Sequence, residues 1–188
     1  TFDKNITVLG VLEFSSIAIG IDALDAMVKV APIKIIDART ICPGKYIVVF
    51  CGDVASTEYS FHKGLETGGE FIVDSLLLKQ VHSEVIEAIG NIKQTDNWGS
   101  SIGIIETLTV TSSIEAADIA AKESGVKIIE IRLAIGYGGK SYVKMIGSLH
   151  DVQASMDVAV GKVDSKKSLC AKSIISRPHH EIKPYFLK

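Results

Sequence analysis

An internal repeat places the strongest constraint on the fold of this 188-residue chain. The pentapeptide Leu-Gly-Val-Leu-Glu at residues 9–13 returns as Ile-Gly-Ile-Ile-Glu at residues 102–106, an offset of 102 minus 9, or 93 residues. Asp25 and Lys29 match Asp118 and Lys122 at the same offset. A period of this length is too long for one unit of a solenoid, so we expect each copy to be a whole domain. We assign the domains to residues 5–92 and 99–184, on either side of a polar linker.

The order of apolar runs predicts the fold class of each copy. In the first copy, runs rich in β-branched residues predict strands at residues 7–12, 33–40, 46–52 and 71–78. Helical spacing and candidate caps predict two helices and a terminal helix over residues 81–89; the candidate caps are Ser15, Ser16 and Asp53. The order β-α-β-β-α-β followed by a helix is typical of a ferredoxin-like domain. We therefore expect an α+β fold with two such domains in tandem.

Composition excludes several classes of function. No apolar run reaches the roughly 18 to 20 residues that span a bilayer. The net charge of −2 comes without the basic stripe that nucleic-acid binding requires. We therefore expect neither a membrane nor a nucleic acid as partner, and the lack of a signal-like start predicts a cytoplasmic location. Hydrophobic residues make up 47% of the chain, which indicates surfaces buried against protein partners.

The sequence contains no residue pattern that indicates catalysis. It has no Ser-His-Asp set, paired-carboxylate site or HExxH sequence, and its histidines are too scattered to suggest a metal site. Glu13 and Glu106 recur after the first strand of each copy, and such repetition favours a structural contact over an acid-base role. We therefore expect that the protein is not an enzyme.

The three cysteines differ in their local sequence. They lack CxxC spacing, which argues against a disulfide framework and against a zinc site within one chain. Cys42 opens a four-residue turn in which Pro43 suits the second position and Gly44 the third, so we expect the thiol to be presented to solvent. A single cysteine is not a metal site by itself, so on residues alone this thiol is either idle or a ligand shared between copies of the chain. Cys51 and Cys170 lie in strand-like segments and are expected to be small core residues.

A glycine-rich segment replaces the cysteine turn in the second copy. Residues 134–140 read Ala-Ile-Gly-Tyr-Gly-Gly-Lys and contain no thiol. The spacing is not that of a phosphate-binding loop, and we expect a strand to follow it, so nucleotide binding is not expected. Three glycines in four residues allow a mobile loop and close approach of backbones.

Three stretches carry a resemblance to a known family. These are Gly-Val-Leu-Glu at residues 10–13, Asp-Ala-Met-Val-Lys-Val-Ala at residues 25–31 and Ile-Ser-Arg-Pro-His at residues 175–179. The chain resembles the bacterial microcompartment shell family twice over nearly its full length, with an unpermuted element order in each copy. Residues 40–45, Thr-Ile-Cys-Pro-Gly-Lys, resemble the tandem-domain, trimeric class that carries an iron-sulfur site in propanediol-utilisation compartments.

This resemblance implies a shell tile with a central pore. Tandem members of the family form homotrimers that mimic the hexamers of single-domain members, and the tiles pack edge to edge with other shell proteins. The resemblance implies pore loops at Pro43, Gly44, Lys45, Gly136, Tyr137, Gly138 and Gly139. It also implies one 4Fe-4S cluster per trimer, shared by three copies of Cys42, which serves electron transfer across the shell or cluster delivery to an encapsulated redox enzyme. The alternative is a plain pore for small metabolites.

The resemblance further implies residues at the tile edge, namely Lys29, Lys122, Arg177 and His179. The two lysines also suit the C-terminal ends of their helices, where positive charge is favourable. The first copy departs from the family pattern, because it reads Lys-Gln-Val-His at residues 79–82 where the second copy has Arg-Pro-His. The edge role of the arginine is therefore expected at Arg177 alone. Lys45 is expected to be solvated, and the alternative is that it adds positive charge beside the thiolate cluster.

Overall fold

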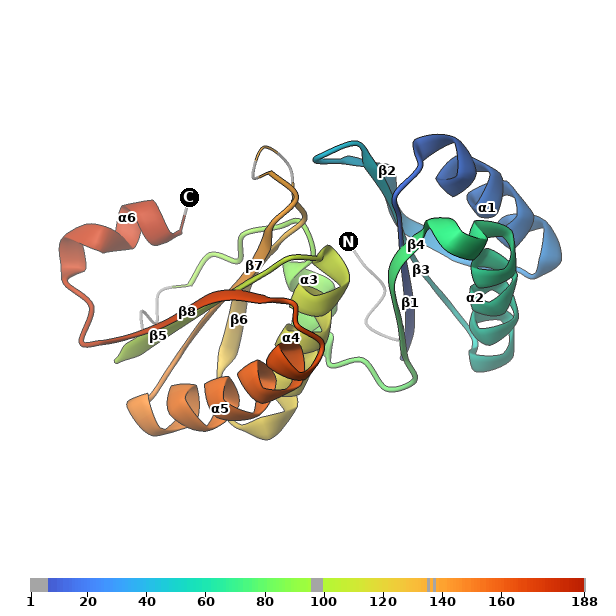
Figure 1. Ribbon diagram of the computed structural model, residues 1–188. Helices are drawn as coiled ribbons and strands as arrows, with labels where there is room; N and C mark the ends of the chain where they lie inside the picture. Colours follow the sequence, from blue (N-terminus) through green and yellow to red (C-terminus); the bar gives the residue numbers. More distant parts are fainter. Residues whose placement is uncertain (1–6, 96–99, 135, 137, 188) are drawn as a thin grey trace. The chain divides into compact units, whose positions relative to one another are not determined.

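The computed structural model describes residues 7–95, 100–134, 136 and 138–187, and the chain divides into two compact units (Figure 1). The first unit extends to Val81 and the second begins at His82. Each unit has a four-stranded antiparallel sheet with two long helices on one face. The predicted α+β fold with two tandem domains is confirmed.

The first unit has the strand order β2-β3-β1-β4, in which every neighbouring pair is antiparallel. This is the arrangement that two interleaved β-α-β units produce. Its elements are β1 (Val8–Phe14), α1 (Ile17–Val30), β2 (Lys34–Ile41), β3 (Lys45–Gly52), α2 (Val54–Gly68), the 3-10 turn η1 (Gly69–Phe71) and β4 (Ile72–Leu78).

The second unit repeats this topology with the strand order β6-β7-β5-β8. A register shift interrupts the pairing of β2 with β3 between Ile35 and Asp37, and the same shift lies between Ile128 and Glu130 at an offset of 93. The elements are α3 (Ser83–Ala88), β5 (Ser101–Thr107), α4 (Val110–Glu123), β6 (Lys127–Arg132), β7 (Ser141–Gly147), α5 (Leu149–Ser165), β8 (Leu169–Ser176), η2 (His180–Ile182) and α6 (Lys183–Phe186).

Helix α3 lies in the second unit, although the sequence placed it at the end of the first domain, which we had extended to residue 92. It packs against α4 and β6, and Val85 and Ile86 are buried. Beyond the helix, the amides of Gly90 and Lys93 donate to carbonyls of β6 at 3.0 and 2.8 Å. The segment is therefore held by contacts with a distant part of the chain, which local sequence patterns do not report.

Helices α1 and α2 begin after the capping residues that the sequence indicated. The Ile19 amide donates to Ser16 Oγ at 3.3 Å, and the Ser56 amide donates to Asp53 Oδ1 at 2.9 Å. These bonds satisfy amides that the first turn of a helix leaves without a partner. Pro32 follows the end of α1, as expected.

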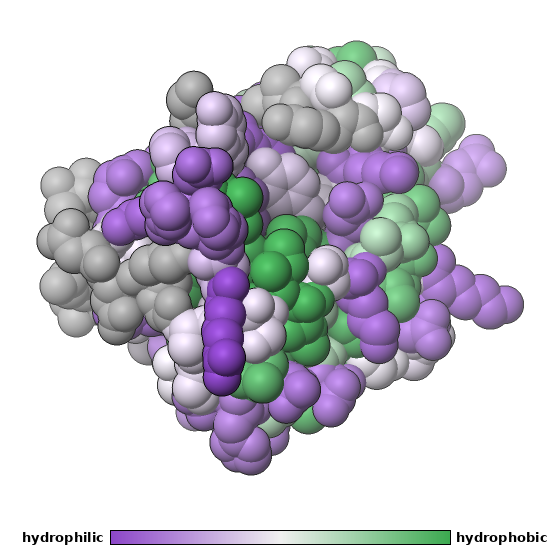
Figure 2. All heavy atoms as spheres, turned by 90° about the vertical axis from the view of Figure 1, so that its left-hand side faces the viewer, coloured by the Kyte–Doolittle hydropathy of each residue, from purple (hydrophilic) through white to green (hydrophobic). Residues whose placement is uncertain are grey.

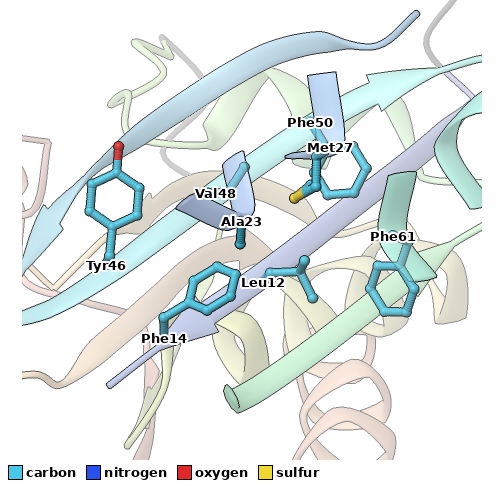
Figure 3. Packing of buried hydrophobic residues seen from close by; sticks show 8 residues of the cluster. All are labelled: Leu12, Phe14, Ala23, Met27, Tyr46, Val48, Phe50 and Phe61. Atoms are coloured by element: carbon cyan, nitrogen blue, oxygen red, sulfur yellow. The ribbon is translucent and has the colours of Figure 1, made fainter. Parts of the chain in front are cut away.

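The core of the first unit lies between its sheet and the two helices (Figure 3). It consists of Leu12, Phe14, Ala23, Met27, Tyr46, Val48, Phe50 and Phe61. Glycine is required where β1 passes beneath an aromatic ring, because a Cβ on Gly10 would lie 2.3 Å from Phe50 Cζ. At the equivalent Gly103, the nearest atoms would be Met145 Cγ and Val152 Cγ1, both at 3.0 Å. The first core is therefore the tighter of the two at this point.

The C-terminal helix covers part of the other face of the second sheet. Phe186 packs with Ile102, Ile129 and Ile146, and it is 7% exposed. A Cβ at Gly103 would point towards Val152 and Met156 of α5. Because adjacent strand residues point to opposite faces, Ile102 and Phe186 lie on the face away from α5.

A cross-strand ion pair occurs at the same place in both sheets. Lys45 Nζ lies 2.5 Å from Glu13 Oε1, with the side chains 15% and 0% exposed. Lys140 Nζ lies 3.9 Å from Glu106 Oε2, with the side chains 57% and 41% exposed. The structural contact expected for the repeated glutamates is thus confirmed, and it is buried only in the first unit.

Apolar side chains also lie on the surface. Figure 2 shows an area where such side chains gather among polar ones. Large exposed apolar residues include Ile17, Ile21, Val28, Ile174 and Ile175. Among the described residues, none of the helices is long and apolar enough to cross a membrane.

Replacing Gly10 with alanine should destabilise the first unit, because the new methyl group would overlap the Phe50 ring. We expect Gly10→Ala to lower the free energy of unfolding by about 1–3 kcal/mol. The control is Gly161→Ala in α5, where the methyl group would meet nothing within 4 Å, and which should raise stability by about 0.5–1 kcal/mol. Urea unfolding followed by circular dichroism measures both. Equal stability of Gly10→Ala and the parent would contradict the packing described.

Removing Lys45 should lower the free energy of unfolding more than removing its counterpart Lys140 does. Lys45→Ala leaves a buried carboxylate without this cation, so we expect a loss of about 3 kcal/mol. Lys140→Ala removes an exposed partner and should cost less than about 1 kcal/mol. The same urea titrations compare the two variants, and similar losses would show that burial does not distinguish the pairs.

Candidate functional site

Cys42 lies in the turn between β2 and β3, as expected, but the turn starts one residue earlier than the sequence indicated. The Gly44 amide donates to the Ile41 carbonyl at 3.1 Å, so the four residues of the turn are 41–44. Pro43 therefore occupies the third position and not the second. Cys42 is half-buried, Pro43 and Gly44 are exposed, and Gly44 has a φ of +84° that suits glycine. The turn thus leaves Cys42 partly accessible.

Lys45 follows this turn and is not solvated, in contrast to our expectation. It opens β3, pairs with Ile41 in the sheet and forms the buried ion pair with Glu13 of β1. A charged group this buried needs a partner, and Glu13 supplies it. Lys45 is therefore held beneath the turn.

The other two thiols are poorer candidates for metal ligation. Cys51, near the far end of β3, is 2% exposed and is a core residue as predicted. Cys170 is half-buried on the edge strand β8 and is not the core residue expected. Burial raises the pKa of the Cys170 thiol, and nearby Lys140 only partly opposes this. Since the thiolate is the form that binds metals, a raised pKa makes Cys170 a weaker ligand.

The hairpin loop of the second unit corresponds to the cysteine turn. Gly136, Gly138 and Gly139 have φ values of +75°, +62° and +87°, which few other residues adopt readily. Strand β7 follows this loop, so the strand predicted after it is confirmed. Tyr137 lies outside the described residues.

The predicted edge residues fall in two places. Lys29 and Lys122 lie in the last turns of α1 and α4, and each forms an ion pair of 2.5 Å with the aspartate one turn earlier. Arg177 and His179 follow β8 and are exposed. Arg177 has a φ of +50°, and its amide donates to the Ser100 carbonyl at 2.8 Å. Their role at a tile edge stays a prediction.

Within the part of the chain that the structure describes, sequence analysis missed a cluster of potential ligands. The side chains of His179, His180 and Glu181 bring their ligand atoms within 4.8 Å of one another, and all three are exposed. They are consecutive residues at the start of η2, a spacing we had not counted as a metal pattern. The available signal was the run of three adjacent ligand-type residues, His-His-Glu.

The chain matches known proteins over both units. The family described as BMC domain matches residues 8–82 and 101–178. The bacterial microcompartment shell protein PduT of Citrobacter freundii is 37% identical over 174 residues, which cover 93% of this chain and 94% of that protein. The major carboxysome shell protein CsoS1 of Prochlorococcus marinus is 34% identical over 91 residues, which cover 48% of this chain and 86% of that protein.

Solved structures show the same architecture. A microcompartments protein from Desulfitobacterium hafniense DCB has a TM-score of 0.84 and 38% identity, with 95% of this chain and 99% of that chain covered. A fused permuted hexameric shell protein of the RMM microcompartment shares the fold at a TM-score of 0.63 and 18% identity, with 84% and 81% covered. These relatives are structural shell proteins and not enzymes, which confirms the expectation that this chain is not an enzyme. The chain therefore belongs to the BMC-domain family and is a tandem-domain shell protein of a bacterial microcompartment.

Proposed function

We propose that three copies of the chain form a six-domain tile with a central pore, and that three Cys42 thiolates hold one 4Fe-4S cluster there. The relative CsoS1 matches about half of this chain over 86% of its own length, so one chain supplies two domains of that size. Three chains then supply six. Closed rotational symmetry is the usual way in which identical chains assemble.

The exposure of Cys42 is the observation that carries this proposal. The turn presents one thiol per chain, while Cys51 is buried and Cys170 lies in the second unit. Cys51 lies six residues beyond Lys45 along β3, a distance of about 20 Å at the rise of a strand. One chain therefore offers one thiol at this turn, and an iron-sulfur cluster needs several. Thiolates from three copies fit this requirement, with a fourth ligand from solvent or a small molecule.

The residues around Cys42 hold the thiol in place. Lys45 is tied to Glu13, so its charge is engaged within the sheet and is not free to balance an anionic site. The ion pair fixes the start of β3, and with it the end of the turn. When bound, a 4Fe-4S cluster gives up and accepts single electrons, which suits electron transfer across the shell or cluster delivery to an encapsulated redox enzyme.

The remaining pore residues come from both hairpin loops in this proposal. Among the described residues, Pro43 and Gly44 line it from the first domain, with Lys45 behind them, and Gly136, Gly138 and Gly139 line it from the second. The absence of large side chains at the glycines allows backbones to approach one another around the axis.

Replacing Cys42 distinguishes the proposed cluster from a plain pore without one. We expect Cys42→Ser to abolish iron binding, since serine supplies no thiolate, and to leave the trimer intact. Cys51→Ala and Cys170→Ala are matched controls that should retain iron. Anaerobic purification, chemical reconstitution and iron analysis should give about four iron atoms per three chains.

Two outcomes of that experiment would overturn the cluster. One is parent protein that binds no iron after reconstitution, which leaves a trimeric tile with a plain metabolite pore. The other is iron retained by Cys42→Ser. A chain that stays monomeric at micromolar concentration would contradict the tile itself.

We also propose that Lys29, Lys122, Arg177 and His179 lie at the tile edge, where the tile meets other shell proteins. The exposure of Lys29, Arg177 and His179 supports this role. The double variant Lys29→Ala, Lys122→Ala should remain a folded trimer but be less stable than the parent. The Lys29–Asp25 pair is exposed and contributes little, whereas Lys122→Ala removes a cation from the buried Asp118. The double variant should co-assemble less with other shell proteins in a sedimentation assay. Unchanged co-assembly would reduce these lysines to charges at helix ends.

A further inference from the structure

The packing of the α3 segment in the second unit shows how the residues that follow the last strand of one domain dock on a helix of another domain. The His82 backbone amide donates to Asp118 Oδ1 of α4 at 2.8 Å, and Lys122 Nζ lies 2.5 Å from Asp118 Oδ2. Asp118 is 3% exposed. Glu84 accepts from the Ile128 amide of β6 at 3.2 Å, so the segment is tied to both the helix and the edge strand.

The docking segment has a counterpart later in the chain. His82 Nδ1 accepts from the Glu84 amide at 3.3 Å, and His179 Nδ1 accepts from the Glu181 amide at 3.4 Å. The backbone angles agree as well, with φ and ψ of −69° and 137° at His82 and of −61° and 139° at His179. His179 therefore matches His82 in its backbone angles and in the bond that its side chain accepts two residues later.

The acceptor helix also has a counterpart, on α1 of the first unit. Asp25 corresponds to Asp118 at the offset of 93, and it forms the same ion pair with the lysine one turn later, at 2.5 Å. The Asp25 side chain is 56% exposed, whereas that of Asp118 is 4% exposed. The acceptor is thus present on α1, in an exposed state.

Apolar residues on the same face of α1 are also more exposed than their counterparts on α4. Ile17 and Ile21 of α1 are 37% and 51% exposed, while their counterparts Val110 and Ile114 of α4 are fully buried. The bulge that shapes β6 beside α3 is repeated in β2. One chain therefore exposes a helix face whose equivalent is covered, and also exposes a second copy of part of the segment that docks on the covered one.

We propose that residues 177–181 of one copy of this chain dock on α1 of a second copy, with the His179 backbone amide donating to Asp25. Each chain has one such segment and one such helix face, so the contact is head to tail. A contact of this kind closes into a ring when its rotation permits, and the inference therefore rests on the trimer proposed above.

The similarity of the two segments extends to Glu181 and no further. Beyond it, α3 continues as one helix, whereas the second copy forms η2 and then α6, with Pro184 in the first turn of α6. Phe186 packs on the second sheet of its own unit. The docked segment consequently ends before α6.

The test uses the full chain carrying Cys42→Ser, so that no shared cluster holds the copies together. Asp25→Ala removes the acceptor, and His179→Pro removes the amide donor at a φ of −61° that proline adopts. Because a hydrogen bond to a charged group is lost, each should raise the dissociation constant of the interface about tenfold or more in analytical ultracentrifugation. The controls are Asp22→Ala, exposed on the same helix, and His179→Ala, which keeps the amide; both should remain trimeric.

Mixing the two variants identifies the pairing. The Asp25→Ala chain keeps a donor and the His179→Pro chain keeps an acceptor, so a mixture should form heterodimers at a concentration where each variant alone is monomeric. A mixture that stays monomeric, or an Asp25→Ala chain that trimerises like the parent, would overturn the docking. Parent protein that binds no iron after reconstitution, while the Cys42→Ser chain still docks as described, would instead contradict only the cluster.

Discussion

The buried ion pair between Glu13 and Lys45 joins the centre of the first sheet to the turn that carries Cys42. A charge this buried is stable only with its partner, so the start of β3 is fixed relative to β1. The same pair in the second unit is longer and exposed, and it lies below a glycine-rich loop with no thiol. The hairpin that carries the potential ligand Cys42 is therefore the hairpin held by a buried ion pair.

Local patterns predicted much of the fold. The order of strands and helices followed from apolar periodicity, and the starts of α1 and α2 followed from Ser16 and Asp53, because capping bonds involve residues three positions apart. The repeat predicted two domains of one topology, and the comparisons and the structure agree. The part of the site that could be predicted was likewise local: a turn that presents Cys42.

Features that depend on distant partners were not predictable. The sequence does not show that Lys45 meets Glu13, 32 residues away, so it was expected in solvent. It does not show that α3 packs on α4 and β6, since helix periodicity reports a buried face but not what covers it. Cys170 looked like a core residue, yet β8 is an edge strand and leaves it half-buried. The starting residue of the cysteine turn depended on which amide donates to the Ile41 carbonyl, and local sequence does not show this.

The two copies of the domain have thus diverged at equivalent positions, in the hairpin loop and in the surroundings of Asp25 and Asp118. This divergence suits a tile in which each chain contributes one thiol and one docking segment to a threefold assembly. Native mass spectrometry of anaerobically reconstituted protein tests that account most directly. We expect one species with the mass of three chains plus four irons and four sulfides, about 350 Da above the bare trimer. A single chain that carries this extra mass by itself, or a trimer that never acquires it, would contradict the account.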